Sequence, residues 1–160
     1  MTDALATLPH GPEFRFVDCL LTLEPGVSGS AEFFLRGDEP FLRGHFPGDP
    51  ILPGVLLIEG AAQLAGVVAQ SDPGRAPLAG LKLTAIRAAK ILGTARPGET
   101  VTFHARVTAR MGGLVSAQAT ATVRGTLVLQ CEVTLAGIDT SHAPVGLDRP
   151  LVPAPPPVGA

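Results

Sequence analysis

The sequence lacks several residue types on which specialised protein scaffolds depend. Its 160 residues include no tryptophan, no tyrosine and only two cysteines. Cys19 and Cys131 do not have the close spacing of a metal-binding pair, and two cysteines alone make no disulfide framework. Because both lie in strand-like runs, we expect them to be buried thiols of a reducing compartment. We also expect no metal and no cofactor.

Charge and long apolar runs are scarce as well. Charged residues make up 16% of the chain and the net charge is −2, a balance that does not favour binding to nucleic acid. No apolar run approaches the roughly 20 residues that span a bilayer. The N-terminus has neither the basic start nor the apolar stretch of a signal peptide. We therefore expect a cytoplasmic protein that binds neither nucleic acid nor membrane.

The apolar content nevertheless suits a compact fold. With 46% apolar residues, the chain can bury a core large enough for one globular domain. We place this domain in residues 1–137. Residues 138–160 are rich in proline and have no periodicity, so we expect a disordered tail.

Alternation of apolar and polar residues predicts most of a sheet, because a strand with one buried face repeats every second residue. The expected strands cover residues 13–23, 27–36, 81–92, 101–111, 115–123 and 127–135. A Pro25-Gly26 turn joins the first two strands. Gly112-Gly113 and a turn near Gly125 join the last three as an antiparallel meander.

One long helix is expected between these two groups of strands, in residues 53–70. Pro53 suits the first helical turn, where its missing N–H is not needed. Nearly every position of this segment is apolar or small, so the helix should be buried on most sides. The sequence thus predicts an α+β fold in which a mostly antiparallel sheet wraps one central helix.

Two titratable residues near the start of this helix are candidates for chemistry. His45 lies in a proline- and glycine-rich loop and can accept a proton at neutral pH. Glu59 lies within the apolar helix, where burial would raise its pKa and favour the protonated form. A neutral carboxylic acid and a neutral imidazole make an acid and base pair. The alternatives are a structural histidine and a glutamate on the helix surface.

Gly54 adds a third element to this group. The first N–H groups of a helix have no partner inside it, so Gly54 and Val55 can stabilise a negative charge on a substrate carbonyl oxygen. Base, acid and oxyanion site lie within fifteen residues of sequence. This grouping suits removal of a proton next to a carbonyl with loss of a neighbouring hydroxyl group.

The segment "GHFPGDPILPGVLLIEGAAQ" (residues 44–63) resembles the active-site segment of the (3R)-hydroxyacyl-acyl-carrier-protein dehydratases of bacterial fatty acid synthesis. The resemblance extends from "LPHGPEFRFVDC" to the strand near Ala136. It implies a hotdog fold, in which a curved antiparallel sheet wraps a central helix. It also implies a homodimer, or a hexamer built as a trimer of dimers, in which histidine and acid come from different subunits.

The resemblance also implies roles for individual residues. His45 matches the histidine that removes a proton from C2, and Glu59 matches the acid that protonates the departing C3 hydroxyl. Gly54 matches the glycine whose N–H contacts the thioester carbonyl, and Phe46, Pro53 and Val55 are expected beside the substrate. Gly60-Ala61 replaces larger residues, and no tyrosine is present to form a gate. The acyl chain could therefore belong to fatty acid, polyketide or aryl polyene synthesis.

A basic segment suggests a partner. No acidic residue occurs between Asp72 and Glu99, whereas five basic residues do. An acidic acyl carrier protein could dock there, and we expect Arg87, Lys90 and Arg96 to contribute. The alternative is that these side chains are only solvated.

Two other functions remain open: a hotdog thioesterase in which Glu59 activates water, and a non-catalytic hotdog subunit of a synthase complex. The remaining histidines are His10 in the N-terminal lead-in, His104 on the polar face of a strand and His142 in the tail. We expect none of these three to be catalytic.

Overall fold

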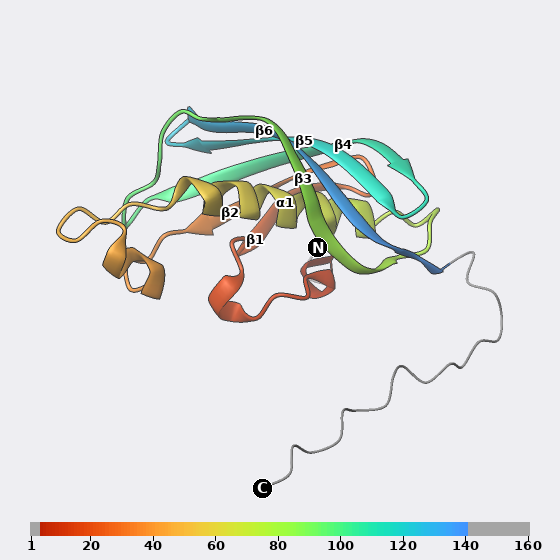
Figure 1. Cartoon of the computed structure of the whole chain (residues 1–160), viewed down its shortest axis with the longest axis horizontal. Coiled ribbons are helices and arrows are strands. Elements are labelled where there is room, and N and C mark those ends of the chain that lie inside the picture. The colour runs from red at the N-terminus through yellow and green to blue at the C-terminus, as the bar shows by residue number, and fades with distance from the viewer. Residues whose placement is uncertain (1–3, 141–160) are drawn as a thin grey trace, which may run out of the picture.

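An antiparallel sheet of six strands curves around one long helix (Figure 1). The computed structural model describes residues 4–140. The strands are β1 Cys19–Glu24, β2 Ser28–Phe34, β3 Leu78–Ile91, β4 Thr100–Met111, β5 Leu114–Val123 and β6 Thr126–Asp139. The helix is α1 Gly54–Gln70, and three short 3₁₀ helices are η1 Ala4–Thr7, η2 Pro12–Phe14 and η3 Pro40–Gly44.

The strand order across the sheet is β1-β2-β4-β5-β6-β3, and every neighbouring pair is antiparallel. The chain leaves β2 for α1 and returns at β3, on the opposite edge of the sheet. Figure 1 shows the helix lying against the concave side of the sheet, with the N-terminal segment on the far side of the helix. The predicted architecture of a sheet wrapped around one helix is confirmed.

Close contact between helix and sheet depends on small residues in α1. Gly60 lies directly under the ring of Phe103 in β4, so that a Cβ atom at position 60 would be 2.5 Å from Phe103 Cζ. Phe103 is fully buried. The replacement of a larger residue by Gly60 leaves no open space beside the helix, because the Phe103 ring fills it. Glycine is needed here for packing, although it costs about 1 kcal/mol of helix stability relative to alanine.

The local patterns predicted α1 and the meander of β4, β5 and β6 within a few residues. The segment around residue 81 is indeed a strand, although β3 begins earlier, at Leu78. The first strand was predicted from residue 13 but begins at Cys19, because Pro12–Phe14 form a 3₁₀ turn. Strand β6 continues to Asp139, two residues beyond the expected end of the domain. Residues 141–160 of the expected tail, including His142, lie outside the described residues.

The two cysteines differ in environment. Both are free thiols, but only Cys131 is buried, whereas Cys19 is exposed at the start of an edge strand. The prediction of two buried thiols is therefore wrong for Cys19. Burial raises the pKa of Cys131 to about 11, which makes this thiol unreactive at neutral pH. Within residues 4–140, no helix combines the length and hydropathy that crossing a membrane requires.

Candidate active site

His45 ends the 3₁₀ helix η3 and begins a tight loop. Its N–H donates to the carbonyl of Leu42 at 3.2 Å, and its own carbonyl accepts from the N–H of Ile51 at 2.8 Å. Phe46 and Asp49 exchange two further backbone hydrogen bonds, at 3.2 and 3.0 Å. The His45 ring is half-buried and stacks on Phe46 with centroids 4.2 Å apart. The backbone of the loop is thus fixed while the imidazole stays accessible.

The segment that follows β3 holds this loop from the other side. The N–H of Leu52 donates to the carbonyl of Ala95 at 2.8 Å, and the Thr94 hydroxyl donates to the carbonyl of Leu52 at 2.6 Å. The Arg96 guanidinium forms an ion pair with Asp49. Hydrogen bonding to Arg96, and then its charge, lower the pKa of Asp49. Arg96, expected at a carrier-docking surface, is therefore engaged with the loop that carries His45.

The loop leads directly into the N-terminus of α1, where Pro53 is the N-cap residue. The N–H of Leu56 donates to the Pro53 carbonyl at 2.9 Å, and no described residue accepts from the N–H groups of Gly54 or Val55. A Cβ atom at position 54 would be only 2.7 Å from Ile91 Cδ1 at the end of β3, so a larger residue would require the Ile91 side chain to move. Two free N–H groups at a helix N-terminus are suited to an oxyanion.

Glu59 lies on α1 and is neither exposed nor fully buried, since its side chain has 21% of its surface accessible. One carboxylate oxygen, Oε1, accepts a hydrogen bond from Gln63 Nε2 at 3.0 Å. The same oxygen lies 3.4 Å from His10 Nε2. Glu59 is thus held by two neighbours, and the alternative of a free surface glutamate does not describe it.

Gln63 ties the helix to the N-terminal segment. It is almost completely buried, with 3% of its surface exposed. Its amide oxygen accepts from the N–H of Phe16 at 2.9 Å, and its amide nitrogen donates to the carbonyl of Phe14 at 2.9 Å. The spacing of four residues between Glu59 and Gln63 placed both on one helix face, so this neighbour could have been read from the sequence. His10 carried no comparable signal.

A cavity of about 510 Å³ begins at Glu59 and runs along α1. Apolar side chains from four parts of the chain form most of its wall: Leu8, Phe14, Val67, Leu81, Leu83 and Leu135. His10, Glu59 and Gln63 lie together in this wall, and Thr7, Gln70 and Lys82 also line the cavity. A mostly apolar cavity with a cluster of polar groups suits a ligand that has a hydrocarbon chain and a polar head.

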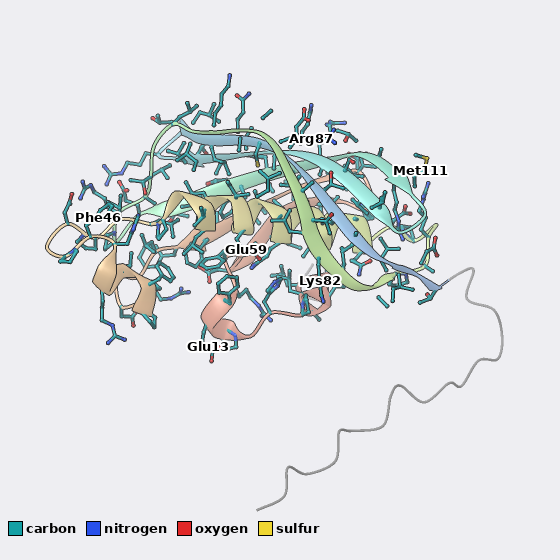
Figure 2. The ribbon with its side chains drawn as sticks, in the orientation of Figure 1. Glu13, Phe46, Glu59, Lys82, Arg87 and Met111 are labelled. Atoms are coloured by element: carbon teal, nitrogen blue, oxygen red, sulfur yellow. The ribbon has the colours of Figure 1, made fainter. Side chains whose placement is uncertain are left out.

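The structure does not bring His45 and Glu59 together within one chain. His45 does not line the cavity beside Glu59, and no contact joins the two side chains. Figure 2 shows Phe46, the neighbour of His45, at one end of the molecule and Glu59 near its middle. A single chain therefore carries two separate groups of functional residues.

The expected docking residues on β3 lie on the outer surface. Arg87 and Lys90 are exposed, and Arg87 faces Glu132 of β6 across the sheet ladder. Figure 2 shows Arg87 on the outer side of the sheet, away from Glu59. Carrier docking there stays a prediction. Among residues 4–140, no three histidine, cysteine, aspartate or glutamate side chains form a group that could hold a metal ion.

A curved antiparallel sheet around one buried helix is the hotdog fold. Solved structures with this fold that resemble the chain include the dehydratase heterocomplex ApeI:P from Xenorhabdus doucetiae, with a TM-score of 0.71 and 17% identity over 87% of this chain and 91% of that chain. Zebra fish thioesterase superfamily member 2 matches with a TM-score of 0.62 and 19% identity, over 83% and 90%. At these identities the likeness shows the fold alone.

Sequence comparison identifies the family. The family model of the FabA-like domain matches residues 8–132, so the chain belongs to the FabA-like family. The protein named 3-hydroxyacyl-[acyl-carrier-protein] dehydratase FabZ in Chloroflexus aggregans is 36% identical over 137 residues, which are 86% of this chain and 94% of that protein. Its namesake in Acetivibrio thermocellus is 34% identical over 137 residues, covering 84% and 91%.

Proposed function

We propose that the protein is a 3-hydroxyacyl-acyl-carrier-protein dehydratase, a hydro-lyase that converts (3R)-3-hydroxyacyl thioesters to trans-2-enoyl thioesters in fatty acid or related acyl-chain synthesis. Membership of the FabA-like family and the names of the curated relatives support this activity. The observation that carries the proposal is Glu59, hydrogen-bonded by Gln63 and contacted by His10, in the wall of a mostly apolar cavity. An acid in that place can reach the hydroxyl of a fatty acyl chain.

In the proposed reaction, His45 takes a proton from C2 and Glu59 gives a proton to the C3 oxygen. The C3–O bond breaks, water leaves, and the electrons of the C2–H bond form the double bond. The N–H groups of Gly54 and Val55 stabilise the negative charge that develops on the thioester oxygen. Transfer of the proton from the His45 imidazolium to the Glu59 carboxylate, through water, then restores both residues. Phe46 and Pro53 would border the thioester.

The active site of this proposal is shared by two copies of the chain. Strand β3 is an edge of the sheet, and the exposed side chains of Ile86, Ile91 and Leu92 lie on it or just after it. A free, partly apolar edge strand can pair with its own copy across a two-fold axis. This pairing would bury apolar surface that the single chain exposes.

The geometry of β3 supports the sharing of sites. One end of β3 touches the helix N-terminus next to the His45 loop, through Ile91 and Gly54. The other end lines the cavity of Glu59, through Leu81 and Leu83. If β3 pairs antiparallel with β3 of a second copy, the Ile91 end of one strand lies beside the Leu81 end of the other. His45 of one copy would then approach Glu59 of the other.

The carrier protein is the proposed macromolecular partner. Arg87 and Lys90 are exposed on the same strand as the proposed dimer contact, where they would present positive charge to an acidic carrier. Charge reversal at Arg87 and Lys90 should slow turnover of carrier-bound substrate more than turnover of a pantetheine thioester. Equal losses on both substrates would remove the docking role.

The direct test supplies a short 3-hydroxyacyl pantetheine thioester and follows enoyl thioester formation by absorbance and mass. Wild type should release water, whereas His45→Ala and Glu59→Ala should each lower kcat by about 10²–10⁴-fold. Hydrolysis to the free acid would instead indicate a thioesterase. A folded dimer that yields no product over several chain lengths would indicate a non-catalytic subunit, and either result would overturn the proposal.

A further inference from the structure

His10 lies against Glu59, although nothing in the sequence pattern links them. It follows Pro9 in the turn between η1 and η2, and its Nε2 is 3.4 Å from Glu59 Oε1. The backbone carbonyl of His10 accepts a hydrogen bond from Arg15 at 3.3 Å, and its ring lies 6.2 Å from the Phe14 ring, centroid to centroid. The imidazole is therefore part of an ordered N-terminal segment that closes over the middle of the helix.

The surroundings of the His10 ring indicate which nitrogen carries the proton of its neutral form. Its Nδ1 is buried and has no hydrogen-bond partner among residues 4–140. A proton on Nδ1 would bury a donor without an acceptor, which costs more than burying a bare acceptor nitrogen of the neutral ring. The proton of neutral His10 therefore belongs on Nε2, which lies 3.4 Å from Glu59 Oε1.

Gln63 fixes the orientation of the Glu59 carboxyl group. Because the Gln63 oxygen accepts from Phe16 and its nitrogen donates to Phe14, the amide cannot turn over without breaking both bonds. Gln63 thus presents an N–H to Glu59 Oε1. With a hydrogen bond from Gln63 and the His10 Nε2–H 3.4 Å away, Oε1 faces donors whether Glu59 is protonated or ionised. The transferable proton of Glu59 is left to the other oxygen, Oε2.

We propose that His10 is a positioning residue for Glu59: its Nε2–H, together with Gln63, holds Oε1 so that Oε2 delivers the proton to the C3 hydroxyl. This inference rests on the proposed dehydratase function. When Oε2 gives up its proton and the C3–O bond breaks, Glu59 becomes a carboxylate, so the hydrogen bond from Gln63 and the interaction with the nearby His10 Nε2–H both become charge-assisted. They strengthen as the reaction proceeds, so His10 should raise kcat rather than lower KM.

Three variants separate the Nε2–H from the bulk of the ring. The amide nitrogen of glutamine can occupy the place of Nε2, the shorter asparagine reaches only to the place of Nδ1, and leucine has no donor. We expect His10→Leu and His10→Asn to lower kcat by about 10- to 100-fold with KM within about twofold. His10→Gln should stay within about threefold of wild type. Equal kcat losses in His10→Gln and His10→Asn would overturn the positioning role.

A double-mutant cycle shows whether His10 acts through Glu59. In the Glu59→Ala background, His10→Leu should cost less than about a further twofold in the residual rate. A loss as large as in the wild-type background would assign His10 to folding or to direct substrate contact, and so contradict the proposal. Active wild type with an unaffected His10→Leu variant would remove the His10 role alone. Inactive wild type would overturn the dehydratase function and the His10 role with it.

Discussion

The loop that carries His45 and the helix that carries Glu59 are held by different kinds of interaction. The loop lies at the surface and depends on backbone hydrogen bonds together with the exposed ion pair between Arg96 and Asp49. Glu59 depends on the packed helix and on the buried amide of Gln63. The proposed base is thus accessible to a second copy of the chain, whereas the proposed acid is set into the core of its own chain.

Substitutions in these two regions should therefore have different effects. Changes near Glu59 should affect folding and catalysis together, because the same side chains serve both. Changes in the His45 loop should affect catalysis with little effect on folding, because an exposed ion pair contributes little to stability.

The largest effect should come from Gln63→Leu, which removes all of the hydrogen bonds that Gln63 makes. The N–H of Phe16 would stay buried without a partner and the carbonyl of Phe14 would lose its donor, at a cost of about 1–3 kcal/mol of unfolding free energy. The proposed acid would also lose its donor, so kcat should fall. Urea unfolding and turnover of a short thioester measure the two effects.

Gln70→Leu is the matched control, since Gln70 makes the same pair of backbone bonds, to the N–H and carbonyl of Leu78, at the other end of the helix. It should lower stability by a similar amount and change kcat much less. Equal kcat losses in the two variants would show that Gln63 acts only through stability.

An intermediate effect is expected at Gly60. Alanine at this position would place its Cβ 2.5 Å from the Phe103 ring, so overpacking should lower the unfolding free energy by about 1–3 kcal/mol. Gly66→Ala on the same helix is the control, because its Cβ would lie at ordinary contact distance, 3.7 Å, from Leu135 and Leu81. Gly66→Ala should stabilise the protein by up to about 1 kcal/mol. Thermal or urea unfolding of both variants checks the difference in sign.

The smallest effect on stability should come from Arg96→Ala, which releases Asp49 and loosens the His45 loop. We expect kcat to fall by about two- to tenfold with an unchanged unfolding midpoint near neutral pH. Because Arg96 lowers the pKa of Asp49, the pair contributes fully above the unfolded-state pKa of about 3.9. Its contribution disappears as the pH falls further. A large loss of stability at neutral pH would contradict this assignment.

The sequence predicted the parts of the fold that follow from local patterns. Helix α1 and the meander β4 to β6 have regular periodicity and clear turns, so their positions could be read directly. The start of β1, the exposure of Cys19 and the contact between Gly60 and Phe103 depend on which segments meet in space. No local pattern records these contacts, and the sequence interpretation of each was wrong or incomplete.

In the candidate site, too, the residues that lie close in sequence were predictable, whereas the contacts between distant segments were not. His45, Gly54 and Glu59 lie close in sequence within one unusual segment, which made them recognisable as a group. His10 was expected not to be catalytic, and no sequence signal linked it to Glu59, yet the structure places it against Glu59 from a segment almost fifty residues away in the chain. The ion pair between Arg96 and Asp49 could not be predicted from the sequence either, because it joins the loop before α1 to the loop after β3.

The central claim, that His45 of one chain works with Glu59 of another, is tested most directly with mixed dimers. His45→Ala and Glu59→Ala subunits carrying different tags are combined, and the heterodimer is isolated and assayed. Each heterodimer would contain one site with both residues intact and one site with neither. We predict about half of the wild-type kcat per dimer, although each parent homodimer is nearly inactive. An inactive heterodimer, alongside active wild type, would contradict the shared site.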